Sequence, residues 1–117
     1  MERYDIAIIG TGPAGLSAAV TAAIRKKKIL LVGSRDLSSK VQKAQEIQNY
    51  LGFPDISGAE LGKAFEEHID RMQVPIAEER VNLIYPMGDY FSLQVGQEIC
   101  EAETVILATG VNFGKPL

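Results

Sequence analysis

The chain has 117 residues, enough for one modest domain, and it carries a formal net charge of −3. This mildly acidic balance argues against a general nucleic-acid binder or a protein of anionic membrane surfaces. No segment approaches the length of a membrane span, and Glu2, Arg3 and Asp5 precede only a short apolar run, so we expect no signal peptide and a cytoplasmic location. Cys100 is the only cysteine, which excludes an intrachain disulfide and favours a buried apolar role over a redox thiol.

A strand, a glycine turn, a helix and a second strand are predicted at the start of the chain. Ile6–Ile9 is a short apolar run rich in β-branched residues, as in a strand buried on both faces. A G-x-G-x-x-G motif follows at residues 10–15, then an alanine-rich helical pattern over Pro13–Arg25 and a second apolar run at Ile29–Val32. This is the order of the first βαβ unit of a dinucleotide-binding fold. A structural turn that binds nothing is the less favoured alternative.

Each glycine of the motif has a distinct physical role. Gly10 lets the chain turn sharply off the strand, Gly12 lets a pyrophosphate approach the backbone, and Gly15 lets the helix pack closely on the sheet. The first helical N–H groups lack intrahelical partners and point at the phosphates, and the helix dipole favours negative charge there. Pro13 suits this position, because its missing N–H would have no partner.

A polar stretch ends the second strand, where NAD-binding units often carry an acidic residue for the ribose hydroxyls. Gly33, Ser34 and Arg35 occupy this place, and Asp36 follows a little late. The departure weakens a simple NAD interpretation. Arg35 could suit a 2′-phosphate, as in a fragment of an NAD(P)-dependent dehydrogenase, although a solvated arginine on a loop is the commoner outcome.

The middle of the chain contains one clear helix. The pattern at Val41–Ile47 does not decide between a helical turn and an extended loop, and residues 49–58 are rich in turn formers. Ala59–Met72 carries an apolar stripe at helical spacing and predicts an amphipathic helix. Ser57 suits the N-cap of this helix, and Glu60 would complete a capping box.

Five short strands are predicted after that helix. The first is Val74–Ala77, and the next three read as an antiparallel β-meander: Val81–Tyr85, Tyr90–Val95 and Ile99–Ala102. A separate apolar run, Thr104–Leu107, would rejoin the parallel sheet, and the tail at residues 111–117 is loop-like. The predicted fold is therefore α/β: a Rossmann-like parallel sheet flanked by helices, with the three-stranded antiparallel β-meander as an excursion at one end.

Four stretches follow one another in a characteristic order: IIGTGPAGLSAA, QEIQNYLGFPDISGAEL, the helix and strand that lead to IAEERV, and TVILATG. In these stretches the chain resembles the N-terminal part of the FAD domain of thioredoxin reductase-like flavoproteins, the low-molecular-weight class of pyridine-nucleotide-disulfide oxidoreductases. The resemblance extends in order and spacing over nearly all of the chain, which makes it much more specific than the glycine motif alone.

The resemblance implies an FAD site. Residues 11–14 would lie along the pyrophosphate, and Gly33 and Ser34 would approach the adenosine. Asn49 would be the flavin-side asparagine, and the backbone of Val81 would reach the adenine. The complete set of implied cofactor-binding residues is Gly10, Thr11, Gly12, Pro13, Ala14, Gly15, Gly33, Ser34, Lys40, Asn49, Val81, Ala108, Thr109 and Gly110.

Two departures from the family pattern affect what we expect. Lys40, within Ser38–Val41, stands where the family usually has a flavin-side glutamine, which leaves the electron donor open between NADPH and ferredoxin. The family also continues beyond this point, with a pyridine-nucleotide domain that carries a C-x-x-C motif and a final segment that completes the FAD domain. We therefore expect residues 1–117 to form a partial FAD-binding domain, without disulfide reductase activity of its own.

Two hypotheses about function follow. In the first, the parent protein passes electrons from the donor through FAD to a thioredoxin-like disulfide, and this chain positions the cofactor. The resemblance also implies a homodimer. In the second, the chain is a stand-alone nucleotide-binding or interaction module without catalysis. Neither hypothesis includes a metal or nucleic acid.

Overall fold

One mixed sheet of six strands forms the centre of the structure, a computed structural model that describes residues 2–110 apart from the side chains of Ser39 and Lys40. The spatial order of the strands is β3-β2-β1-β6-β5-β4. The pairs among β3, β2, β1 and β6 are parallel, whereas β5 is antiparallel to both β6 and β4. The predicted tail, residues 111–117, lies outside the described residues. The strands are β1 (Arg3–Ile9), β2 (Ile29–Val32), β3 (Ile76–Ala77), β4 (Val81–Pro86), β5 (Phe91–Val95) and β6 (Glu98–Leu107).

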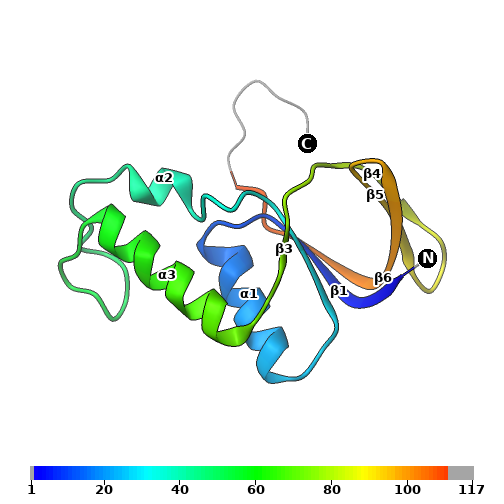
Figure 1. The fold of residues 1–117 in the computed structure, drawn as a ribbon, viewed down its shortest axis with the longest axis horizontal. Coiled ribbons are helices and arrows are strands. Elements are labelled where there is room, and N and C mark those ends of the chain that lie inside the picture. The colour runs from blue at the N-terminus through cyan, green and yellow to red at the C-terminus, as the bar shows by residue number, and fades with distance from the viewer. Residues whose placement is uncertain (1, 111–117) are drawn as a thin grey trace.

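Helices cover one face of the parallel half of the sheet (Figure 1). Ile8 of β1 and Leu31 of β2 are fully buried on this face, in a cluster with Leu16 and Ile69 from two of the helices. The βαβ unit predicted at the start of the chain is thereby confirmed, with the first helix ending one residue earlier than expected. The helices are α1 (Pro13–Ile24), α2 (Ser39–Gln42) and α3 (Gly58–Met72).

The antiparallel half of the sheet encloses a second core on the opposite face. Ala7 of β1 and Val32 of β2 belong to one buried cluster with Leu93 and Val95 of β5. Since neighbouring residues of a strand point to opposite faces, Ala7 and Ile8 enter different cores. Burial on both faces explains why β1 and β2 are continuous apolar runs rather than alternating ones.

The prediction of two separate strands, Ile99–Ala102 and Thr104–Leu107, is wrong, because both ranges belong to the single strand β6. β6 is antiparallel to β5 over its first half and parallel to β1 over most of its length. The charged Glu103 interrupts the apolar pattern, and the register of β1 with β6 contains no pair between Asp5 and Glu103. The strand nevertheless continues, because pairing with β1 resumes at Thr104, whose hydroxyl also donates to the Asp5 carbonyl oxygen at 2.8 Å. The meander is thus continuous with the parallel sheet.

The predicted cap of α3 is confirmed. The N–H of Glu60 donates to Ser57 Oγ at 3.1 Å, and the hydroxyl of Ser57 lies 3.1 Å from Glu60 Oε1. Between β2 and α3, only the four residues of α2 are helical, and an antiparallel bridge between Ile47 and Ile56 holds the loop that follows them. Among residues 2–110, none of the helices is both long and apolar enough to cross a membrane.

Gly15→Ala should destabilise this fold. The added Cβ would lie 1.9 Å from the carbonyl oxygen of Gly10. That oxygen belongs to the backbone, so α1 would have to move away from β1. We expect the free energy of unfolding to fall by about 1–3 kcal/mol, measured by urea denaturation with circular dichroism.

Gly12→Ala is the matched control. A Cβ at Gly12 meets no atom within 4 Å, and the backbone there is extended. Its free energy of unfolding should stay within about 0.5 kcal/mol of the parent. Equal losses in the two variants would contradict the packing of the glycine turn described above.

Candidate functional site

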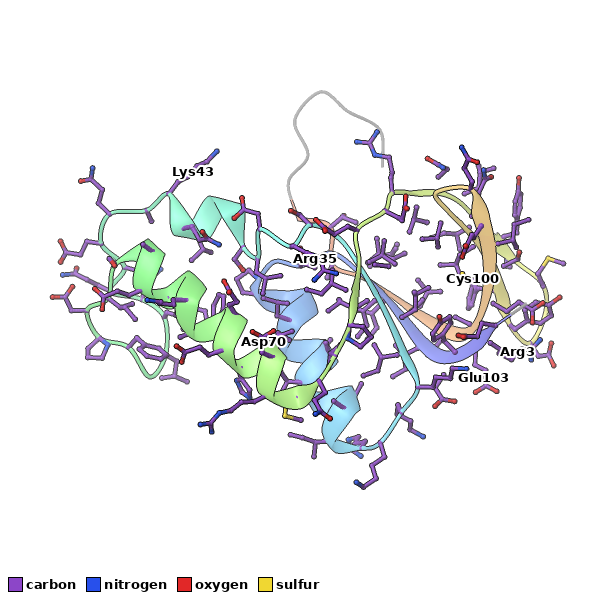
Figure 2. All side chains as sticks on the ribbon, in the orientation of Figure 1. Arg3, Arg35, Lys43, Asp70, Cys100 and Glu103 are labelled. Carbon is purple, nitrogen blue, oxygen red and sulfur yellow. The ribbon has the colours of Figure 1, made fainter. Side chains whose placement is uncertain are left out.

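A cleft of about 680 Å³ opens at the carboxyl ends of β1, β2 and β6. Open α/β sheets bind ligands outside the carboxyl ends of their strands, so this is the expected position for a nucleotide. Figure 2 shows Arg35 near these strand ends, whereas Cys100 lies apart from them, in the antiparallel half of the sheet. The cleft brings together residues that the sequence predicted at separate positions: Gly10, Gly33, Ser34, Val81 and Thr109.

The glycine turn and the end of β6 pack backbone against backbone. Gly10 has a φ of +123°, and its N–H donates to the carbonyl oxygen of Val32 at 2.9 Å. A Cβ at Gly10 would lie 2.0 Å from the carbonyl oxygen of Ala108. The N–H of Ala108 in turn donates to the carbonyl oxygen of Ile9 at 2.8 Å. The expected sharp turn off β1 is therefore confirmed, and it places Ala108 directly beside the glycine motif.

Gly12 differs from its neighbouring glycines, because the chain itself does not require it. The residue is the N-cap of α1, its φ is −79°, and a Cβ would meet nothing within 4 Å. Pro13 follows as the first helical residue, and Ala14 is exposed. The first N–H groups of an α-helix have no intrahelical partner, and the helix dipole attracts anions to them. The open space at Gly12 therefore lies where a phosphate could approach.

Thr11 connects the glycine motif to the loop after β2. Its side chain is buried, and Oγ1 donates to the carbonyl oxygen of Ser34 at 2.9 Å. The carbonyl oxygen of Thr11 accepts from the N–H of Ser38 at 2.9 Å. A Cβ at Gly33 would lie 2.6 Å from Thr11 Cγ2, so a side chain there would push the two loops apart. The hydroxyl of Thr11 is thus occupied within the fold.

Other predicted site residues lie outside the cleft. Asn49 is exposed and lines a different hollow, in the turn-rich loop before α3. Pro13 lines a small cavity between α1 and α3. Lys40 belongs to α2, and its side chain lies outside the described part of the chain. Gly110 is exposed at the end of the described residues. The residues expected at the adenosine therefore converge, whereas those expected at the flavin do not.

Charged residues of the cleft were missed by the sequence interpretation. Glu78, Glu79 and Arg80 follow β3 and line the cleft beside Val81. Arg35 Nε donates to Glu78 Oε1 at 2.7 Å, so the arginine considered for a 2′-phosphate is already paired. The signal for this group was the polar run EER directly after a predicted parallel strand, since such strand ends meet at one edge of the sheet.

Cys100 is buried, as the sequence predicted. Burial raises the pKa of its thiol above the usual value, and the carboxylates of Glu98 and Glu2 add to the effect. Burial likewise raises the pKa of the nearby Tyr4 to about 12. Because the thiolate is the nucleophile in thiol chemistry, Cys100 is poorly suited to disulfide exchange. Within residues 2–110, no group of three or more His, Cys, Asp or Glu side chains could hold a metal ion.

Cys100 should therefore resist alkylation in the native chain. Its raised pKa means that the thiolate forms only at higher pH than in a free cysteine, whose pKa is about 8.5. We expect iodoacetamide to react more slowly than in urea-unfolded chain, with a rate that rises at higher pH, as measured by mass spectrometry. Native and unfolded chains that react equally fast at neutral pH would show that the thiol is accessible and ionised.

Sequence comparison finds a protein family and relatives that match most of this chain. A family profile described as pyridine nucleotide-disulphide oxidoreductase matches residues 4–116. The chain is 34% identical over 109 residues to a thioredoxin reductase of Ureaplasma parvum, covering 93% of this chain and 35% of that protein. It is 29% identical over 112 residues to thioredoxin reductase of Bacillus subtilis, covering 96% and 35%, respectively. The chain thus spans about a third of the length of these relatives.

Solved structures agree with the architecture described above. A ferredoxin-flavin thioredoxin reductase from Clostridium acetobutylicum is 56% identical, with a TM-score of 0.93 over 100% of this chain and 41% of that chain. Thioredoxin reductase from Streptococcus pyogenes is 32% identical, with a TM-score of 0.86 over 97% of this chain and 37% of that chain. The α/β class with a Rossmann-like sheet is thereby confirmed.

Proposed function

Because this chain belongs to the pyridine nucleotide-disulphide oxidoreductase family, we propose that it supplies the FAD-binding part of a thioredoxin reductase-like flavoprotein. The observation that carries the proposal is the position of Gly12. This glycine lies at the N-terminus of α1, in the same turn as Gly10, which lines the cleft at the carboxyl strand ends, and neither backbone conformation nor packing requires it. A pyrophosphate in the open space explains why a side chain is missing there.

The proposed FAD orientation follows from the two parts of the site. The pyrophosphate lies along residues 11–14, where the helix dipole of α1 favours negative charge. The adenosine lies in the cleft, next to Gly33, Ser34 and the backbone of Val81, which all line it. The flavin extends in the opposite direction, toward α2 and the loop that carries Asn49. Ala108–Gly110 complete the turn beside the glycine motif.

The residues of this chain bind and orient the cofactor rather than exchange disulfides. FAD, when bound, supplies electron transfer between a reduced donor and a disulfide. Cys100 is buried in the core of the antiparallel half of the sheet, so no thiol of the described residues lies at the cleft. We propose a thioredoxin-like protein as the disulfide partner. The 56% identical neighbour is a ferredoxin-flavin thioredoxin reductase, which supports ferredoxin over NADPH as the electron donor.

We also propose that the parent protein is cytoplasmic and forms a homodimer. A cytoplasmic location is supported by the single, unpaired cysteine of the chain, since disulfides are rare in reducing compartments. A homodimer is supported by apolar side chains on the outer face of the antiparallel strands, where Tyr85 and Ile99 are about half exposed.

Gly12→Val tests where the pyrophosphate lies. The branched side chain fits the extended backbone of the parent but would occupy the space proposed for the phosphates. We expect the affinity for ADP and for FAD to fall at least about tenfold, equivalent to about 1.4 kcal/mol, in isothermal titration calorimetry. The circular dichroism spectrum should be that of the parent.

Ser17→Val is the control for this variant, because it adds a valine to an exposed position of α1 farther from the helix N-terminus. It should bind both nucleotides as the parent does. If Gly12→Val also binds them with unchanged affinity, the pyrophosphate does not lie at the α1 N-terminus and the proposed FAD orientation fails.

A further inference from the structure

The end of β2 lacks the acidic residue that dinucleotide-binding units often place there, but the neighbouring strand supplies one. β2 and β3 are parallel, and Val32 pairs with Ala77 in their register. The N–H of Gly33 donates to the carbonyl oxygen of Ala77 at 3.1 Å. Glu78 is the next residue, so it leaves the sheet beside Gly33, at the same edge and at the cleft.

The carboxylate of Glu78 is held in place by Arg35. Arg35 Nε donates to Oε1 at 2.7 Å, and the Arg35 backbone N–H lies 3.4 Å from Oε2. Both side chains are more than half exposed, so this pair adds little to stability. The pair instead fixes positions: it links the loop after β2 to the end of β3, and it places the Arg35 cation against the Glu78 carboxylate.

We propose that Glu78 is a specificity-determining residue of the cleft, which accepts hydrogen bonds from the adenosine ribose and discriminates against a 2′-phosphate. The inference rests on the proposed function, since it assumes that an adenosine occupies the cleft. It assigns to Glu78 of β3 the task that other dinucleotide-binding units give to the end of β2.

The chemistry of the pair explains both parts of this proposal. A carboxylate accepts hydrogen bonds at about four lone-pair positions, so Glu78 can receive ribose hydroxyls while it keeps Arg35. A 2′-phosphate is an acceptor and an anion, and it offers Glu78 no proton when fully ionised. If it approached Arg35, it would lie close to the Glu78 carboxylate and leave two negative groups side by side. Arg80 also lines the cleft.

The test compares two isomers that carry the same number of phosphates. ADP has its second phosphate on the 5′ chain, whereas adenosine 2′,5′-bisphosphate has it on the ribose. The full chain should bind ADP more tightly, by about fivefold or more, the size of one exposed charge interaction. In Glu78→Gln, which removes the charge and frees Arg35, this preference should shrink by about fivefold in calorimetric titrations at constant ionic strength.

Two further variants separate the pair from general charge effects. Arg35→Ala added to Glu78→Gln should remove the gain in affinity for the 2′-phosphate. Glu101→Gln also breaks an exposed pair, that between Glu101 and Arg3 at 2.9 Å, but its residues do not line the cleft. It should therefore leave the ratio of the two affinities unchanged.

The outcomes distinguish this inference from the function on which it rests. If the parent binds ADP and Glu78→Gln keeps the same preference, Glu78 does not determine specificity, although the nucleotide site stands. A parent chain that prefers adenosine 2′,5′-bisphosphate would also overturn the inference. A parent that binds neither isomer would overturn both this inference and the proposed nucleotide site.

Discussion

The close approach of three backbone segments at the carboxyl ends of β1 and β6 is the constraint on which the candidate site depends. Gly15 brings α1 against the carbonyl of Gly10, and Gly10 in turn lies against the carbonyl of Ala108. A Cβ at either glycine would come within 2.0 Å of a backbone oxygen. With no side chain between them, the N-terminus of α1 is held directly at the edge of the sheet, close to Gly10, which lines the cleft.

The glycines around the candidate site therefore belong to two classes: those that the packing of the chain requires and one that it does not. Gly10, Gly15 and Gly33 are needed by the fold itself, because a Cβ at each would clash with atoms of the chain. Gly12 has ordinary backbone angles and open space in front of it. In the proposed site, a bound pyrophosphate accounts for the missing side chain at Gly12. The same logic gives Glu78 a reason to stand next to Gly33, where a ribose would need an acceptor.

Local patterns predicted most of the fold, and features that depend on distant pairing were missed. The βαβ unit, the Ser57 cap and buried Cys100 follow from short-range spacing and polarity, so they could be read from the residues. The continuity of β6 could not, because Glu103 breaks the apolar pattern and β1 supplies the pairing that carries the strand onward. The Arg35–Glu78 pair joins residues 43 positions apart, so only the β2–β3 register reveals it. The adenosine-side residues converge for the same topological reason, whereas Asn49 depends on an irregular loop.

The central claim is that the carboxyl-end cleft and the α1 N-terminus together hold FAD. The most direct measurement is a visible absorption spectrum of the gently purified chain, followed by release and identification of any bound cofactor and by titration of the colourless chain with FAD. The account predicts flavin absorption from co-purified FAD, or its saturable uptake during the titration. A folded chain that carries no flavin and takes up neither FAD nor ADP would contradict it.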